Sequence, residues 1–227
     1  MVLIIIYLIK SNSETNQYIN NLFSFKYSSK IIKKIFNLGY PSALQMMFEV
    51  GIFISGIWVC GIIGINYQAA NQIALNLSSL TFMVALGLSV AATIRVGNQK
   101  GLNDYKNLKR IAISIFLITI MIEFIFALIF IIFSDLLPWL YLDNYGSSDV
   151  LETVTLASKL LIVVALFQIF DGIQIVAQGA LRGIQDVKIP SIICFLSYVV
   201  FGIPIMICLG LYTELKATGV WIGFLIG

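Results

Sequence analysis

Two carboxylates inside long apolar segments are the residues whose type and position most clearly indicate chemistry. Glu49 lies in the apolar stretch Leu38 to Gly61, and Asp171 lies in a second one, Leu160 to Leu181. At about 1.5 Å per helical residue, Glu49 is roughly 17 Å from Leu38 and Asp171 is roughly 15 Å from Leu181. Both acids therefore lie near the middle of a hydrocarbon layer of about 30 Å. A carboxylate at that depth costs roughly 3 kcal/mol or more unless it faces a protein interior or a wet cavity, so it indicates a functional site.

The chemistry that such a pair can perform is the exchange of cations. A carboxylate in a low-dielectric cavity can hold a proton, a hard cation or an organic cation in turn, and each excludes the others. We hypothesise that Glu49 and Asp171 form this site, and that both are Na⁺ ligands if the exchanged ion is Na⁺. The alternative is that both acids only form hydrogen bonds between buried helices. Four amides on the same or neighbouring segments are expected to supply oxygen ligands or substrate hydrogen bonds: Gln45, Asn76, Gln168 and Gln174.

The elements that must position these residues are membrane helices. Apolar residues make up 59% of the chain and charged residues 11%, whereas soluble domains have about 45–50% and about 25%. The composition predicts an all-α, polytopic membrane helix bundle in contact with the lipid bilayer. The chain has no histidine, which removes the usual His-based acid–base, triad and zinc chemistry. We therefore predict no enzyme activity, no catalytic residue, no cofactor and no nucleic-acid partner.

Apolar segments and the polar stretches between them predict the domain organisation. Residues 1–9 are too few to cross a bilayer and are expected to be the tail of a truncated helix, followed by a basic cytoplasmic connector at 10–38. Gly39 and Pro41 are expected at the start of the first full span, because proline is tolerated there. Gly202 and Pro204 are expected to kink the fifth span. The lobe 39–227 is predicted to contain spans at 39–63, 69–94, 111–133, 158–180 and 189–211, with an incomplete one at 217–227.

Charge placement predicts the orientation. If the connector is cytoplasmic, twelve of the fourteen lysines and arginines lie on the cytoplasmic side, which satisfies the positive-inside rule. A third acid, Glu123, interrupts the apolar third span. We interpret it as a structural acid turned toward a neighbouring helix.

Several short motifs in this order resemble the multidrug and toxic compound extrusion (MATE) family, bacterial type, and fit its second six-helix lobe. The resemblance covers about Gly39 to Gly227. The motifs are Gly39 to Gln45 with Glu49, Gln68 to Ile73, Arg95 to Gly97, Gln168 with Asp171-Gly172, Leu181 to Gly183 with Asp186, and Gly219 to Gly223.

The resemblance implies a twelve-helix, two-lobe antiporter in the bacterial cytoplasmic (inner) membrane. Such a transporter exports small organic, often cationic, molecules in exchange for Na⁺ or H⁺, and the positions of Glu49 and Asp171 match the acids that carry cation coupling. Some members have a tyrosine where this chain has Phe167, whose ring could still face a cationic substrate. The N-terminal lobe is missing, so the chain is expected to be truncated at both ends and not to transport alone. Alternatives are a related lipid-linked oligosaccharide flippase and an inactive fragment of a split transporter.

Overall fold

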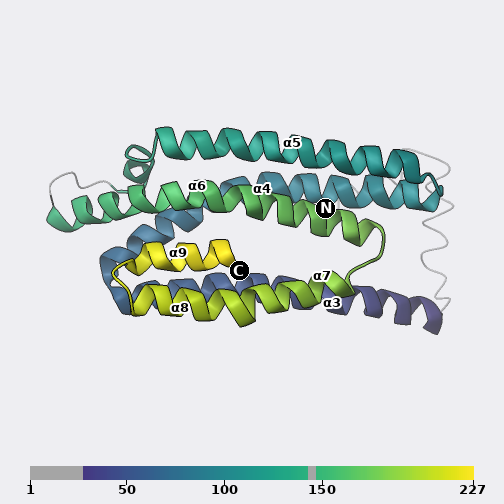
Figure 1. The fold of residues 1–227 in the computed structure, drawn as a ribbon, viewed down its shortest axis with the longest axis horizontal. Helices are drawn as coiled ribbons and strands as arrows, with labels where there is room; N and C mark the ends of the chain where they lie inside the picture. The colour runs from purple at the N-terminus through teal and green to yellow at the C-terminus, as the bar shows by residue number, and fades with distance from the viewer. Residues whose placement is uncertain (1–27, 143–146) are drawn as a thin grey trace, which may run out of the picture. The chain divides into compact units, whose positions relative to one another are not determined.

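The structure, a computed structural model, describes residues 28–142 and 147–227. The predicted truncated helix at 1–9 and the connector as far as residue 27 lie outside the described residues. In the described residues every regular element is a helix (Figure 1). The residues of the candidate site all belong to one compact unit, Leu38–Gly227.

The first described helix, α3 (Ser29–Ile63), differs from the prediction at its start. Pro41 lies inside this helix, so the expected helix start at Gly39 and Pro41 is wrong. Membrane helices tolerate proline where nearby hydroxyls help to satisfy the backbone groups that it disturbs. Ser42 follows Pro41, and its hydroxyl donates a hydrogen bond to the Leu38 carbonyl oxygen at 2.9 Å. The last residues of the predicted connector, from Ser29, belong to the same helix as the first predicted span.

The next three long helices extend beyond their predicted spans into polar sequence. They are α4 (Ile65–Gly101), α5 (Tyr105–Ile132) and α6 (Ser148–Gly183), against predicted spans of 69–94, 111–133 and 158–180. A search for apolar segments finds only the part of a helix that suits hydrocarbon. At the start of α5, the Asp104 side chain accepts a hydrogen bond from the Asn107 backbone N–H at 3.1 Å and so caps the helix.

The fifth predicted span is interrupted by a π-helix that begins well before Gly202 and Pro204, where a kink is predicted. The span consists of α7 (Lys188–Cys194), the π-helix η2 (Phe195–Gly202) and α8 (Ile203–Leu211). Pro204 has no N–H for the carbonyl one turn earlier, and local π adjustments help membrane helices to satisfy such a freed group. A short 3₁₀ helix, η1 (Leu137–Leu140), precedes α6, and α9 (Lys216–Ile226) follows α8.

Helix α6 is the central element of the bundle. It packs against α4, α5 and α9, while α4 also packs against α5, and α8 packs against α9 (Figure 1). Leu160, Leu161 and Val164 of α6 are fully buried, as are Val220 and Trp221 of α9. Five of the described helical segments are long and apolar enough to cross a membrane, and α9 is a shorter apolar helix. The five long segments correspond in order to the five full spans predicted from the sequence.

Candidate functional site

Glu49 and Asp171 line the same pocket, which has a volume of about 360 Å³. Helices α3 and α4 form its two walls, and α6 contributes Asp171. Glu49 is half-buried, and Asp171 is only 8% exposed. The remaining lining residues are Met46, Val50 and Phe53 of α3 and Leu75, Ser78, Ser79, Phe82 and Met83 of α4.

Helical periodicity explains why these residues meet. The α3 lining residues occur at intervals of three and four, from Met46 to Phe53, and the α4 lining residues repeat these intervals from Leu75 to Met83. Residues at such intervals share one face of a helix. The two stripes line the pocket, and Asp171 reaches it from α6.

Charged side chains around the pocket act on one another. Asp171 lies within electrostatic range of both Glu49 and Glu123, so an ionised Asp171 is repelled by each of these carboxyls when it is ionised too. Arg182, farther along α6, lies close enough to Glu49 to attract it. The lining itself contains two acids and no basic residue. An incoming cation would therefore relieve a repulsion that the protein's own side chains leave uncompensated within the pocket.

The uncharged residues that line the pocket suit an organic cation better than they suit an inorganic ion. Phe53 and Phe82 provide aromatic surface, which attracts cations through the ring face. Met46 and Met83 are flexible and polarisable, and such side chains adapt to ligands of different shape. Small-molecule sites are typically apolar cavities with a few fixed polar groups, and this pocket has that composition.

Two of the predicted amides lie buried at helix contacts outside the pocket. The Gln45 amide donates a hydrogen bond to the Cys194 sulfur at 3.4 Å, across the α3–α7 contact. The Gln168 amide donates to the Glu123 carbonyl oxygen at 3.4 Å, across the α5–α6 contact. Neither residue lines the pocket that contains Glu49 and Asp171.

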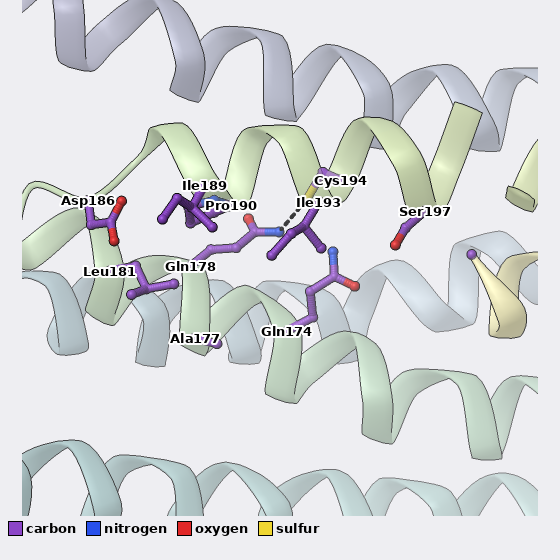
Figure 2. A pocket seen from close by; sticks show the side chains of 11 residues that line it. Gln174, Ala177, Gln178, Leu181, Asp186, Ile189, Pro190, Ile193, Cys194 and Ser197 are labelled. Atoms are coloured by element: carbon purple, nitrogen blue, oxygen red, sulfur yellow. Dashed lines mark hydrogen bonds between the residues drawn. The ribbon is translucent and has the colours of Figure 1, made fainter. Parts of the chain in front are cut away.

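The other two predicted amides also lie elsewhere. Gln174 lines a second pocket of about 270 Å³ between α6 and the α7–η2 segment, where it lies near Gln178 and Cys194 (Figure 2), and its amide donates a hydrogen bond to the Tyr198 hydroxyl. Asn76 is exposed, and its amide donates to the Gln72 carbonyl oxygen at 2.9 Å on its own helix.

The polar residues of α6 therefore contact different neighbouring helices and do not all face one cavity. A binding role for Gln45, Asn76, Gln168 and Gln174 stays a prediction, and their placement lends it no support. On α6, which packs against α4, α5 and α9, Gln168 and Gln174 lie six residues apart and therefore point toward different neighbours.

The expectation for Phe167 needs correction. This side chain is 6% exposed and does not line the pocket. Its ring packs edge-to-face against Trp221, with 5.5 Å between ring centroids, and against Phe53 at 6.0 Å. Phe53 is the ring of this cluster that reaches the pocket. The sequence did not single out Phe53, although its spacing of four residues from Glu49 is a signal for a shared face.

The polar side chains of α4 face different neighbours. Of Gln72, Asn76 and Ser79, which are spaced by four and three residues, only Ser79 lines the pocket. The buried polar residues in this part of α4 include Asn71, whose side-chain oxygen accepts a hydrogen bond from the Trp221 indole N–H at 2.9 Å. Ser78 is 7% exposed and lines the pocket. Asn71 is adjacent to Gln72, and Ser78 is adjacent to Ser79. The sequence spacing of polar residues alone therefore does not show which of them face the protein interior.

Comparison with known proteins places this arrangement in a family. The MatE family model matches residues 41–207. A "Probable multidrug resistance protein NorM" of Agrobacterium fabrum is 36% identical over 194 residues, which is 86% of this chain and 42% of the relative. A "Multidrug resistance protein MdtK" of Proteus mirabilis is 37% identical over 200 residues, with the same two coverages. The chain thus spans less than half the length of these curated relatives.

Solved structures show the same fold. A crystal structure of a MATE protein in complex with MaL6 aligns with 99% of this chain and 49% of its own length, at a TM-score of 0.81 and 21% identity. The eukaryotic MATE transporter AtDTX14 aligns with 97% of this chain and 48% of its own length, at 0.80 and 22%. At this identity the likeness establishes the fold alone. From the family match, the close relatives and the apolar helices, this chain is a multi-pass membrane protein that belongs to the MATE family.

Proposed function

We propose that this chain is the cation-binding lobe of a secondary active transporter that exports organic, often cationic, compounds by antiport against Na⁺ or H⁺. The observation that carries the proposal is the placement of Glu49 and Asp171, from two separate helices, in one pocket. The names of the relatives, which are multidrug resistance proteins, support efflux as the process.

The mechanism follows from competition for negative charge. With both carboxyls ionised, the pocket attracts an organic cation, and its aromatic and methionine walls favour a large apolar one. A proton on either acid, or a Na⁺ ion held by their oxygens, removes the charge that retains that cation. Binding of the coupling ion and of the exported compound is therefore mutually exclusive, and the ion gradient drives export.

Transport also needs a second lobe and a membrane. In transporters of this kind, alternating access arises when two repeats rock about a site near the bilayer midplane. The relatives are more than twice as long as the part that this chain matches, so we propose an N-terminal lobe as the partner. The charge distribution favours insertion in the bacterial cytoplasmic membrane with the Arg95–Arg110 side inside.

The flippase alternative is less compatible with this pocket. A lipid-linked oligosaccharide carries a pyrophosphate, which calls for basic side chains. Among the residues that line the pocket, the charged ones are Glu49 and Asp171, both acidic. We therefore favour a cationic cargo.

The test is an efflux measurement in a two-lobe protein. Residues 39–227 replace the corresponding lobe of the Proteus mirabilis relative, and the product is reconstituted in liposomes that contain a fluorescent organic cation. A Na⁺ gradient and a pH gradient are then imposed separately. We expect efflux under at least one gradient and its loss in both Glu49→Gln and Asp171→Asn.

Asp149→Asn is the matched control, because Asp149 is an exposed acid at the start of α6, far along the helix from Asp171. It should transport like the unmodified chimera. Coupled efflux that survives both pocket substitutions would show that these acids are structural and would remove the basis of the proposal.

A further inference from the structure

Glu123 of α5 is a third intramembrane acid that the pocket does not use. It is 1% exposed, and it lines none of the pockets described above. Neither of its carboxyl oxygens has a hydrogen-bond partner in the described part of the chain. The expectation that it turns toward a neighbouring helix is met by its position against α6, where a Cβ on Gly172 would lie 2.7 Å from its Cγ and 2.9 Å from its Cδ.

A second unpartnered acceptor lies in the same helix contact. The Gln168 amide nitrogen donates to the Glu123 backbone carbonyl, but its side-chain oxygen is buried and has no donor. Gln168 precedes Gly172 by four residues, so both face α5. This contact therefore holds three buried oxygen acceptors without a donor: both Glu123 carboxyl oxygens and the Gln168 side-chain oxygen.

An ionised Glu123 would be poorly compensated here. A buried charge without a partner costs several kcal/mol or more, and such groups usually become neutral instead. On α6, Asp171 lies within electrostatic range of Glu123 and carries charge of the same sign when ionised. The polar groups of α4 supply no countercharge, because α4 has no acidic or basic residue before Arg95.

We propose that Glu123 is a proton-binding site that holds a proton at neutral pH, separate from the pocket of Glu49 and Asp171. The proton binds one carboxylate oxygen of Glu123 and forms a neutral carboxylic acid. This converts one unpartnered acceptor into a donor, for which the unpartnered Gln168 oxygen is an available acceptor.

A metal ion fits this contact less well than a proton does. Hard divalent cations take six or more oxygen ligands, and this contact offers three unpartnered ones. No group of three or more acidic, histidine or cysteine residues that could hold a metal ion occurs in the described residues.

The proposal does not depend on the transport function. It requires only that Glu123 remain neutral, whether or not the pocket binds an organic cation. Repulsion between ionised Glu123 and ionised Asp171 would, however, favour a proton on Glu123 whenever Asp171 is charged.

Infrared spectroscopy of the purified chain in detergent tests the proposal, because a protonated carboxyl has a carbonyl stretch distinct from that of a carboxylate. The background is the double variant Glu49→Gln/Asp171→Asn, in which Glu123 is the remaining acid within the predicted spans. We expect a protonated-carboxyl band at neutral pH in this background and its loss when Glu123→Gln is added. The isosteric glutamine keeps the shape of the side chain, and helix content by circular dichroism checks the fold.

Two results would overturn the proposal. Absence of the band from the double variant at neutral pH would mean that Glu123 is ionised, and this reading does not require the triple variant to fold. A band that disappears when NaCl is added at constant pH would mean that Na⁺ displaces the proton, so that the site is a sodium site. Neither result bears on whether the pocket acids drive efflux, so the two proposals fail separately.

Discussion

At the scale of single residues, the pocket gains its character from a few side chains on facing stripes. Glu49 and Asp171 supply charge, and Phe53 and Phe82 supply aromatic surface. Phe53 also packs against Phe167 and Phe224, so it links the pocket to the core, whereas Phe82 belongs to the smaller packing group around Val176. A substitution at Phe82 is therefore better suited than one at Phe53 to change cation binding without a large change in the stability of the fold.

Replacement of Phe82 by alanine should weaken the binding of an organic cation with little loss of fold. A cation over an aromatic ring gains about 0.5–1 kcal/mol at accessible sites, which corresponds to roughly a two- to fivefold increase in Kd. Fluorescence anisotropy with ethidium measures the change. Phe124→Ala is the matched control, because Phe124 is 54% exposed on α5 and outside the pocket. Equal affinities of the two variants would remove Phe82 from the site.

The hydrogen bond between Trp221 and Asn71 should matter for stability. Trp221→Phe deletes the indole N–H and leaves the Asn71 side chain, whose amide nitrogen is already unpartnered, with no hydrogen bond at all. A buried polar group without a partner costs about 1–3 kcal/mol. Unfolding in a denaturing detergent measures the loss.

Asn71→Leu tests the same bond from the other side. Added to Trp221→Phe, it removes the stranded amide and should recover part of the stability. If the double variant loses as much stability as the two single substitutions added together, the two side chains do not interact. The hydrogen bond would then not be what couples α4 to α9.

At the scale of helices, close approach between backbones positions α4 against α6. A Cβ on Gly183 would lie 2.7 Å from the Thr93 carbonyl oxygen and 3.0 Å from the Gly97 nitrogen. Small residues permit such contacts between membrane helices. The distance from α4 to α6 determines whether Asp171 reaches the pocket, so this contact supports the site from a distance.

Gly183→Ala should therefore separate the two helices and destabilise the lobe by about 1–3 kcal/mol, as overpacked contacts do. Gly87→Ala on α4 is the matched control, because a Cβ there meets nothing within 4 Å. That substitution should be neutral or stabilise the helix by roughly 0.5–1 kcal/mol. Thermal unfolding of both variants in the same detergent makes the comparison, and a stable Gly183→Ala protein would contradict the packing described here.

The cap of α5 predicts a pH dependence outside the membrane. Hydrogen bonds from Asn107 lower the pKa of the Asp104 carboxyl below its ordinary value. A lowered folded-state pKa means that the ionised cap stabilises the fold above about pH 4 and that this contribution is lost as the pH falls through the lowered pKa. Asp104→Asn keeps a capping side chain without the charge. The native protein should melt higher than this variant near neutral pH, and the difference should shrink in acid; a difference independent of pH would contradict the assignment.

At the scale of the whole molecule, the sequence predicted the class of fold and the number of membrane helices better than the orientation of their polar faces. Apolar length alone identifies a span, whereas the face that a residue presents depends on which neighbours surround its helix. Glu49 and Asp171 line one pocket, and the cost of burying an acid in a membrane is the signal that singled them out; their role as a cation site stays a prediction. Gln45 and Gln168 lie outside that pocket, because amides can also satisfy their hydrogen bonds at contacts between helices.

Helix boundaries were likewise predicted less well than the number of membrane helices. The hydrophobic windows missed the polar extensions of α4 and α6, and proline chemistry in isolation predicted a helix start at Pro41 that the continuous α3 does not have. The widened turns of η2 begin at Phe195, nine residues before Pro204, which is more than the missing N–H of this proline explains by itself. Features of this kind arise from tertiary contacts, which no local pattern contains.

The most direct test of the central claim is a competition experiment on the lobe itself. The purified chain is titrated with a fluorescent organic cation at several proton and Na⁺ concentrations. We predict that one of the two ions competes with the fluorescent cation, and that Glu49→Gln and Asp171→Asn each weaken its binding. Binding that is unaffected by either ion and equal in both variants would contradict the claim that these two acids form a shared cation site.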